Sequence, residues 1–501
     1  MENKLEELLV PPDPNVEYEC ALDMNSKGFT LLMKLVLLTK KHPFLEDYIR
    51  KYILDYKEEL NKQNENGWSA LMLACIFSKT KSTENTIKIL IDANCDVNFK
   101  TTIEMTALIL SCRNSNTYST EKTVKMLIDA GADVNFKPNN GGLTALITAC
   151  MHSSTDSSEN TVKMLIDAGS DVNLMDNDGF TALMNACSKS EKIVRMLIVA
   201  GADLNLKDNN GQTALITACS ISSIDNSEKI VKMLIDGGAD LNLKTTEGHT
   251  ALMLSCKYSS NNSSENTVKM LIDSGADLNL KTNDGHTALM LSCKYSSNDS
   301  SENTVKMLID SGADLNLKNN YGMTALMKAC RYSRTVSSEK TVKMLIDAGA
   351  DLNLKDDEGN TALIIVSKDH NENIIKMLMD NNAIFTIENL KKCDGLYKNI
   401  FQILSEYLIN LNIKKYISRT NYLNVIKHIP YFNKVLRFKY GTISQKIIKY
   451  KFQIDSKPDN HIFNLTFSEI MENDKQILDY LNINNYQELY KLKEYVDFWA
   501  S

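Results

Sequence analysis

The amino-acid sequence has no hydrophobic run long enough to cross a membrane. The longest run near the start, FTLLMKLVLLTKK, is interrupted by Lys34 and is shorter than the roughly 20 apolar residues that a membrane helix needs. The first residues, MENKLEELLVPP, are acidic and poor in apolar side chains, so they do not resemble a secretory signal. We therefore expect a cytoplasmic protein whose 11 cysteines stay as thiols in a reducing compartment.

The sequence also lacks the common catalytic and metal-binding motifs. It contains no glycine-rich phosphate loop, no HExxH pair and no nucleophile elbow. The segment DNDG at 176–179 suggests a calcium loop. However, Leu174 stands where an EF-hand needs a carboxylate, and Asn185 stands where it needs the closing glutamate. We therefore predict a protein that is not an enzyme and that binds no cofactor and no metal.

What the sequence does contain is a repeat. The string TALMLSCKYSS occurs at 250–260 and again, 37 residues later, at 287–297. Its opening threonine has a Thr or Ser counterpart along most of the chain, at spacings of 32 to 39 residues. These positions are Thr30, Ser69, Thr106, Thr144, Thr181, Thr213, Thr250, Thr287, Thr324 and Thr361. A fixed period in this range indicates a stack of similar structural units.

Each unit has the pattern of two short helices joined by turns. A glycine stands two residues before the threonine in most units, as in NDGHT, and favours a tight hairpin-like turn. The threonine can cap a first helix such as TALMLSC. A Ser-rich turn then leads to a segment such as SSENTVKMLIDAGADLNLK, which has a serine cap, an early glutamate, a Val/Leu/Ile stripe and a terminal glycine. The pattern predicts an all-α fold of about ten helix-turn-helix repeats.

The order Gly-x-Thr-Ala-Leu, helix, turn, helix, Gly-Ala-Asp-Leu-Asn resembles the ankyrin repeat over residues 20–386. The resemblance implies an α-solenoid with short hairpin turns and a groove for a protein partner. The usual Thr-Pro-Leu-His is replaced by Thr-Ala-Leu-Met or Thr-Ala-Leu-Ile, and most units have about four extra residues in the Ser-rich turn, which the unit at Thr181 lacks. The Asn-, Lys- and Ile-rich style resembles ankyrin proteins of large amoeba-infecting DNA viruses, which would place the chain in the host cytoplasm.

Eight cysteines share one place in the unit. Stacked helices lie ~8–10 Å apart, which is too far for neighbouring cysteines to share a zinc ion or form a disulfide. We therefore predict that they are small buried residues packed between helices. These cysteines are Cys75, Cys112, Cys150, Cys187, Cys219, Cys256, Cys293 and Cys330.

The two positions after this cysteine, together with those flanking the turn glycine, are the candidate partner-binding positions. By the ankyrin resemblance, the positions after the cysteine line the concave groove, and the positions flanking the turn glycine are its fingertips. Tyr and Arg are frequent in binding hot spots. An alternative is that recently duplicated units share these residues by descent and use them for intramolecular packing. The candidates are Glu247, His249, Lys257, Tyr258, Asp284, His286, Lys294, Tyr295, Tyr321, Met323, Arg331 and Tyr332.

The chain changes character near residue 386. Residues 387–501 contain 17 Lys+Arg and 12 Asp+Glu, which gives them a net charge of +5. Since the whole chain has a net charge of −7, residues 1–386 have a net charge of −12. Within them, 407–454 has ten Lys+Arg, no acidic residue and many aromatic residues. We predict three parts, namely an N-terminal segment at 1–19, a repeat domain at 20–386 and a basic helical C-terminal domain at 387–501.

Three functions remain open from the sequence. The first is a non-enzymatic scaffold that binds a protein partner, such as a host-cell protein, in the groove through Tyr258, Tyr295 and Tyr332. The second is an adaptor whose C-terminal domain recruits a ubiquitin-ligase subunit, since 465–481 faintly resembles an F-box without its Leu-Pro start. The third is nucleic-acid binding by the basic, aromatic tail. A basic cap docked on the acidic repeats would explain the same charges, and no membrane partner is expected.

Overall fold

The computed structural model describes most of the repeat region in two compact units. One unit comprises residues up to 292 together with 298–313, and the other comprises residues 293–297 together with those from 314 onward. The expectations for 1–19, for 387–501 and for Tyr258 lie outside the described residues. The described ranges are 28–115, 118–153, 156–220, 227–257, 265–296, 302–333, 337–368 and 371–384, with only the backbone described at 156–158.

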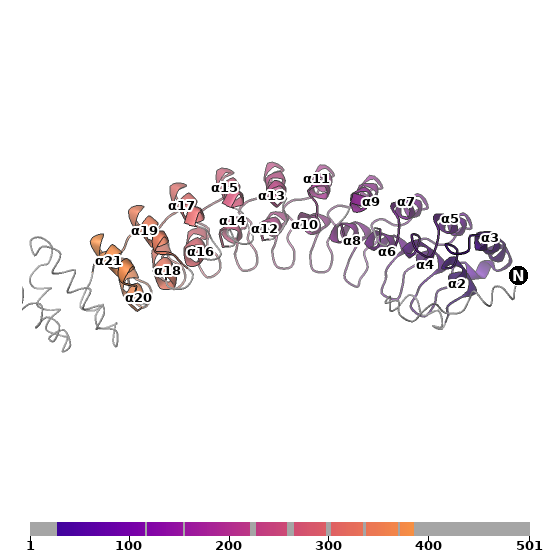
Figure 1. The fold of residues 1–501 in the computed structure, drawn as a ribbon, viewed down its shortest axis with the longest axis horizontal. Helices are drawn as coiled ribbons and strands as arrows, with labels where there is room; N and C mark the ends of the chain where they lie inside the picture. Colours follow the sequence, from indigo (N-terminus) through magenta and orange to yellow (C-terminus); the bar gives the residue numbers. More distant parts are fainter. Residues whose placement is uncertain are drawn as a thin grey trace, which may run out of the picture. The chain divides into compact units, whose positions relative to one another are not determined.

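Ten helix pairs occupy these ranges, which confirms the expected all-α fold of helix-turn-helix repeats (Figure 1). The described residues contain no strand, and the hairpin turns close with isolated bridges such as the one between Gln63 and Ser69. The first helices are α2 (Leu31–Val36), α4 (Ala70–Ile76), α6 (Ala107–Arg113), α8 (Ala145–Met151), α10 (Ala182–Cys187), α12 (Ala214–Ser220), α14 (Ala251–Lys257), α16 (Ala288–Tyr295), α18 (Ala325–Tyr332) and α20 (Ala362–Lys368). The second helices are α3 (Leu45–Asp55, followed by the short η1, Lys57–Glu59), α5 (Glu84–Asp92), α7 (Glu121–Asp129), α9 (Asp156–Asp167), α11 (Glu191–Val199), α13 (Ser227–Asp236), α15 (Glu265–Asp273), α17 (Glu302–Asp310), α19 (Glu339–Asp347) and α21 (Glu372–Asp380).

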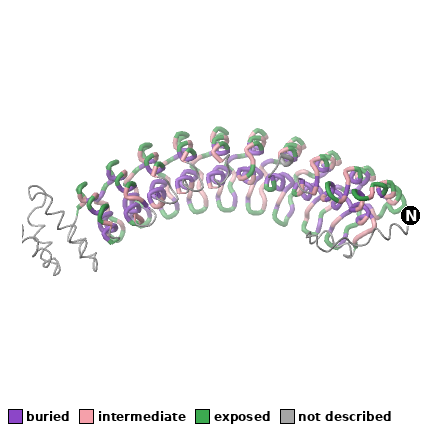
Figure 2. Tube along the Cα trace, viewed as in Figure 1, coloured by how far each residue is buried: buried purple, intermediate pink, exposed green. Residues whose placement is uncertain are grey.

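The first helices form the inner layer and are almost fully buried. In the first unit the first helices from α2 to α14 pack against their own second helices, and those from α2 to α12 also pack against the next first helix. The second helices bury one stripe and expose the other, as Figure 2 shows. The repeated threonine caps each first helix as expected, because its hydroxyl accepts the N–H of the residue three positions later, for example 3.3 Å from Met253 N to Thr250 Oγ1.

The repeated cysteines are buried free thiols, which confirms the packing prediction. Cys219 is 1% exposed and Cys256 is fully buried. Burial raises the pKa of each of these two thiols to about 12. A thiol with so high a pKa holds almost no reactive thiolate at neutral pH.

The turn glycines take the left-handed conformation, with one informative exception. Gly248 has φ +84°, and its counterpart in an earlier repeat is Glu104, which takes φ +62° without being a glycine. The Glu104 carboxylate accepts hydrogen bonds from the backbone N–H and the side-chain amide of Asn139 in the following repeat. We infer that these bonds offset the cost of a left-handed glutamate.

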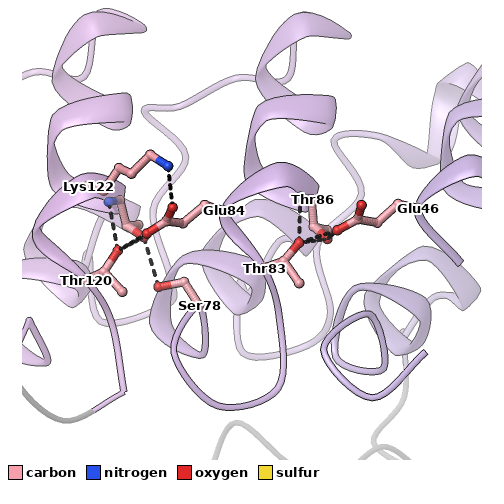
Figure 3. A network of polar contacts seen from close by, with 8 residues as sticks. Glu46, Ser78, Thr83, Glu84, Thr86, Thr120 and Lys122 are labelled. Atoms are coloured by element: carbon pink, nitrogen blue, oxygen red, sulfur yellow. Dashed lines mark hydrogen bonds and ion pairs between the residues drawn. The ribbon is translucent and has the colours of Figure 1, made fainter. Parts of the chain in front are cut away.

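A glutamate near the start of several second helices bridges two repeats. Glu84 accepts a hydrogen bond of 3.0 Å from Thr120 Oγ1 and forms an ion pair of 2.6 Å with Lys122, both in the next repeat (Figure 3). Thr120 also caps its own helix α7 by accepting the N–H of Thr123 at 3.1 Å. The same device recurs where the Ser-rich insertion is missing, since Glu159 binds Ser190 at 3.2 Å and Lys192 at 3.1 Å.

We expect Thr120→Ala to destabilise the chain by about 1–2 kcal/mol. The substitution removes both the helix cap and the bond to Glu84, each of which is of the order of 1 kcal/mol. Thr120→Ser keeps the hydroxyl and should stay within about 0.5 kcal/mol of the natural chain. Urea unfolding followed by circular dichroism measures the difference, and equal losses for the Ser and Ala variants would show that the hydroxyl has no such role.

A second polar ladder joins the repeats at the opposite ends of the second helices. Asn135 Oδ1 accepts the backbone N–H of Asp171 in the next repeat at 2.7 Å. Its side-chain amide donates to the carbonyl oxygen of Gly169 at 3.2 Å. The following repeat uses Asn173 in the same way. The Asn of the Gly-Ala-Asp-Leu-Asn motif therefore holds neighbouring repeats in register.

Candidate binding face

The candidate binding residues of the second unit lie on the ends of first helices and on a hairpin turn. Asn319 shapes that turn, because its Oδ1 accepts the N–H groups of Tyr321 at 3.0 Å and Met323 at 2.9 Å. Gly322 between them has φ +71°. This geometry leaves Tyr321 60% exposed and turns Met323 inward, where it is 3% exposed.

The sequence predicts Met323 as a fingertip contact for a partner, but its side chain is buried beneath the turn and offers almost no surface. Its sulfur accepts a contact from Arg331 Nη1 at 3.6 Å. The exposed Arg331 guanidinium is thus steadied by the turn that presents Tyr321. Met323 supports the face from beneath, while Arg331 and Tyr321 remain accessible.

Lys294, Tyr295 and Tyr332 form what we call the tyrosine cluster. The Lys294 ammonium lies 4.5 Å from the ring centroid of Tyr295 and 5.2 Å from that of Tyr332. Both distances are within the range of a cation–π interaction. Tyr295 ends α16 and Tyr332 ends α18, and each is half-buried. The cluster therefore offers two ring edges and one cation, ordered by contacts within the protein.

In the first unit the structure places an acidic tip above a half-buried histidine. Glu247 is exposed and its Oε2 lies 3.5 Å from His249 Nδ1. Burial lowers the pKa of His249, the Glu247 charge opposes this shift, and Lys257 adds to it. His249 is thus neutral at pH 7, and its backbone N–H donates to Thr245 Oγ1 at 3.1 Å. The contact between Glu247 and His249 is therefore a polar contact, not an ion pair.

The next hairpin repeats this arrangement. The backbone N–H of His286 donates to Thr282 Oγ1 at 3.1 Å, and His286 is half-buried while Asp284 is exposed. In both turns the carboxylate at the tip is accessible and the histidine forms part of the base.

Two lysines on this face were missed by the sequence reasoning. Lys368 ends α20, at the place in the helix that Arg331 holds in α18. Lys328 replaces a leucine of the preceding repeat, is 7% exposed and has its Nζ 6.0 Å from the Tyr332 ring. Aligning the seventh residue of each first helix would have found Lys368. No sequence signal marks Lys328 as part of the face, because its position is otherwise apolar in neighbouring repeats.

A separate shallow cavity of about 530 Å³ lies on the second helices α5 and α7. It is lined by Lys40, Lys79 and Lys88, and by Glu84 with its bridge to Lys122. Glu84 places a negative charge inside an otherwise basic cavity, and its partners already satisfy it. The cavity therefore belongs to the junction between repeats rather than to the candidate binding face.

Within the described ranges, no three His, Cys, Asp or Glu side chains are grouped closely enough to hold a metal ion. Among the same residues, no helix has the length and apolar character that a membrane span requires.

Comparison with known proteins agrees with this architecture. A family model described as ankyrin repeats (3 copies) matches more than half of the chain, from residue 32 to residue 389. Its overlapping matches cover 32–137, 78–173, 151–245, 220–319, 257–356 and 296–389.

Among curated proteins, the chain is similar to three ankyrin repeat proteins of Acanthamoeba polyphaga mimivirus. It is 38% identical to L289 over 76 residues, which are 15% of this chain and 14% of L289. It is 36% identical to L122 over 73 residues, which are 15% of this chain and 12% of L122. It is 35% identical to L86 over 75 residues, which are 14% of this chain and 12% of L86. The matched segments thus span 12–14% of each relative.

Proposed function

The chain belongs to the ankyrin-repeat family, and we propose that it is a non-enzymatic scaffold that binds a protein partner on the face made by its first helices and hairpin turns. Ankyrin repeats generally mediate protein–protein interactions. A stack of such repeats creates an extended surface in which each unit contributes a few side chains. The relatives are viral proteins, so the partner we expect is a cytoplasmic protein of a host cell.

The observation that carries this proposal is the exposure of Tyr321 on its hairpin turn. A tyrosine that is 60% exposed at the tip of a rigid turn has no role in the core. Tyrosine buries a large area on binding while only two torsions lose freedom. Arginine and tyrosine also dominate the residues whose truncation weakens protein interfaces most. The half-buried rings of Tyr295 and Tyr332 can gain contact area without any rearrangement of the helices.

In the first unit, taken by itself, we propose a second set of partner contacts made by the exposed Glu247 and Asp284 with His249, His286 and Lys257. Their side chains are variable between repeats in the sequence, which suits recognition of a specific partner. We propose that the acidic tips contribute specificity rather than affinity, because exposed ion pairs add little binding free energy.

We expect the triple variant Tyr295→Ala, Tyr321→Ala, Tyr332→Ala to lose at least tenfold in affinity for the partner. Each tyrosine at an interface centre contributes on the order of 1–2 kcal/mol. The partner is first identified by capture from host-cell lysate with the intact chain, and affinities are then measured with purified proteins. Circular dichroism checks that helicity is retained.

The matched control is Tyr48→Ala on α3 together with Tyr56→Ala at the C-cap of that helix. These substitutions should leave the affinity unchanged within about twofold, because they lie off the proposed face. An affinity that survives the triple variant, or that falls equally in the control, would rule out the face as the binding site.

A further inference from the structure

The second unit carries three cations at one shared place, near the ends of three successive first helices. Lys294 lies in the last turn of α16, Arg331 in that of α18, and Lys368 ends α20. Among the described residues, none of the three forms an ion pair with a carboxylate. The outer helix of the same unit differs, because Lys343 pairs with Asp347 at 3.8 Å.

The fold does not require these cations. A positive charge in the last turn of a helix is favourable to the helix dipole. Yet α4, α8 and α12 carry Ile76, Met151 and Ser220 at the same place and form equally regular helices. Their capping threonines and buried stripes suffice without the charge. Among the described residues, the three cations form no ion pair with a carboxylate, and their helices form without them. They can therefore bind a ligand.

We infer that this row of cations binds a carboxylate-rich segment of a partner protein, an inference that rests on the proposed function. The Lys294 ammonium is held over the Tyr295 and Tyr332 rings, and Arg331 is held by the Met323 sulfur. Both cations are thus ordered before the ligand arrives, which lowers the entropic cost of binding.

The spacing of the repeats sets the pattern of the ligand. Neighbouring packed helices lie ~8–10 Å apart. An extended chain advances about 3.3 Å per residue, so residues three apart are separated by about 10 Å. The segment therefore carries Asp or Glu at every third position and lies across the helix ends in an extended conformation. The tyrosine rings take an apolar side chain placed between the carboxylates.

A nucleic acid fits this face less well. The adjacent hairpin exposes Asp357 and Glu358, and the N–H of Asp357 donates to the carbonyl oxygen of Tyr321 at 3.2 Å. These two carboxylates border the exposed tyrosine and would repel a continuous phosphate backbone. A peptide can place its acidic residues over the helix ends and its neutral residues beside the hairpin.

The test uses the full-length chain and fluorescent ten-residue peptides. One peptide has Glu at every third position with Tyr between, the second replaces each Glu with Gln, and the third has the same composition with its glutamates in one block. We expect micromolar binding of the first peptide, with at least tenfold weaker binding of the other two.

The charge-reversed variant Lys294→Glu, Arg331→Glu should also bind the first peptide at least tenfold more weakly. Lys343→Glu is the control for charge and should change its affinity less than twofold.

Equal affinity for the Glu and Gln peptides would overturn the inference, as would undiminished binding by the charge-reversed variant. Tighter binding of a twelve-nucleotide single-stranded DNA in competition would also overturn it, by showing that the face prefers phosphate. Binding of the Gln peptide that is lost in Tyr295→Ala, Tyr332→Ala would refute the acidic ligand while supporting a protein-binding face. Failure of all peptides to bind at millimolar concentration would overturn the inference alone, because capture of the partner tests the scaffold separately.

Discussion

Replacing Gly248 with alanine is expected to destabilise the chain by about 2–5 kcal/mol. Gly248 has φ +84°, a conformation that costs an alanine about 1–2 kcal/mol. A Cβ there would also lie 2.6 Å from the backbone nitrogen of Asn283 and 2.9 Å from the Cα of Thr282. These are backbone atoms of the next hairpin and cannot rotate away, so the two hairpins must separate. Forced overpacking of this kind costs typically 1–3 kcal/mol more.

Gly275→Ala is the matched control for this prediction. Gly275 ends α15 with φ +89°, so its backbone strain equals that of Gly248, but an added Cβ would meet no atom within 4 Å. Its loss should be about 1 kcal/mol, since the alanine also reduces the entropy of the unfolded chain. Urea unfolding compares the two variants.

Hydrogen exchange adds a local readout for the Gly248 variant. The N–H of Asn283 donates to the Glu247 carbonyl oxygen at 3.0 Å across the two hairpins and should lose its protection in Gly248→Ala alone. Equal destabilisation by both alanines would mean that only the backbone angle matters and that the hairpins are not in close contact.

The helices, their caps and the buried cysteines could be predicted because each is a local pattern that recurs many times. Thr250 caps α14 for reasons contained in its own segment, and Cys256 is buried because it lies on the apolar side of the same helix. Repetition strengthens such patterns, since a chance arrangement does not recur at a fixed period.

Features that depend on how one repeat contacts the next could not be predicted in the same way. The sequence of one repeat shows a glutamate early in its second helix, whereas the hydrogen bond of Glu84 joins it to Thr120, 36 residues later. Tyr321 and Met323 flank one glycine and had equal weight in the sequence. The bonds to Asn319 turn one side chain outward and the other inward, and these depend on the turn geometry. The sequence therefore predicted which positions belong to the candidate site, but not which of their side chains are exposed.

The chain is also expected to unfold cooperatively in mild alkali, near pH 10, in the presence of a reducing agent. The thiols of Cys219 and Cys256 have pKa values raised to about 12 by burial. A thiol in an unfolded chain has a pKa of about 8.5. Between these values the unfolded state has lost the proton that the folded state keeps, so the free energy of unfolding falls as pH rises. Below about pH 8 these thiols make no contribution to the pH dependence.

The size of the effect follows from the number of thiols in the column. Each thiol lowers the free energy of unfolding by about 1.4 kcal/mol per pH unit above about pH 8.5. Burial also raises the pKa of Cys112, Cys150 and Cys187. With five such groups, the loss between pH 8.5 and pH 10 is about 10 kcal/mol, comparable to the whole stability of a typical domain.

The double variant Cys219→Ala, Cys256→Ala separates the thiols from other groups that titrate in alkali. Removing two thiols should reduce the slope of unfolding free energy against pH by about 2.8 kcal/mol per unit near pH 9.5. The substitutions leave small cavities and lower the stability at pH 7 by about 1–2 kcal/mol. The variant should therefore be less stable than the natural chain at pH 7 and more stable at pH 10. If the two curves run parallel over this range, the thiols do not control the alkaline transition, and the lysines and tyrosines of the surface do.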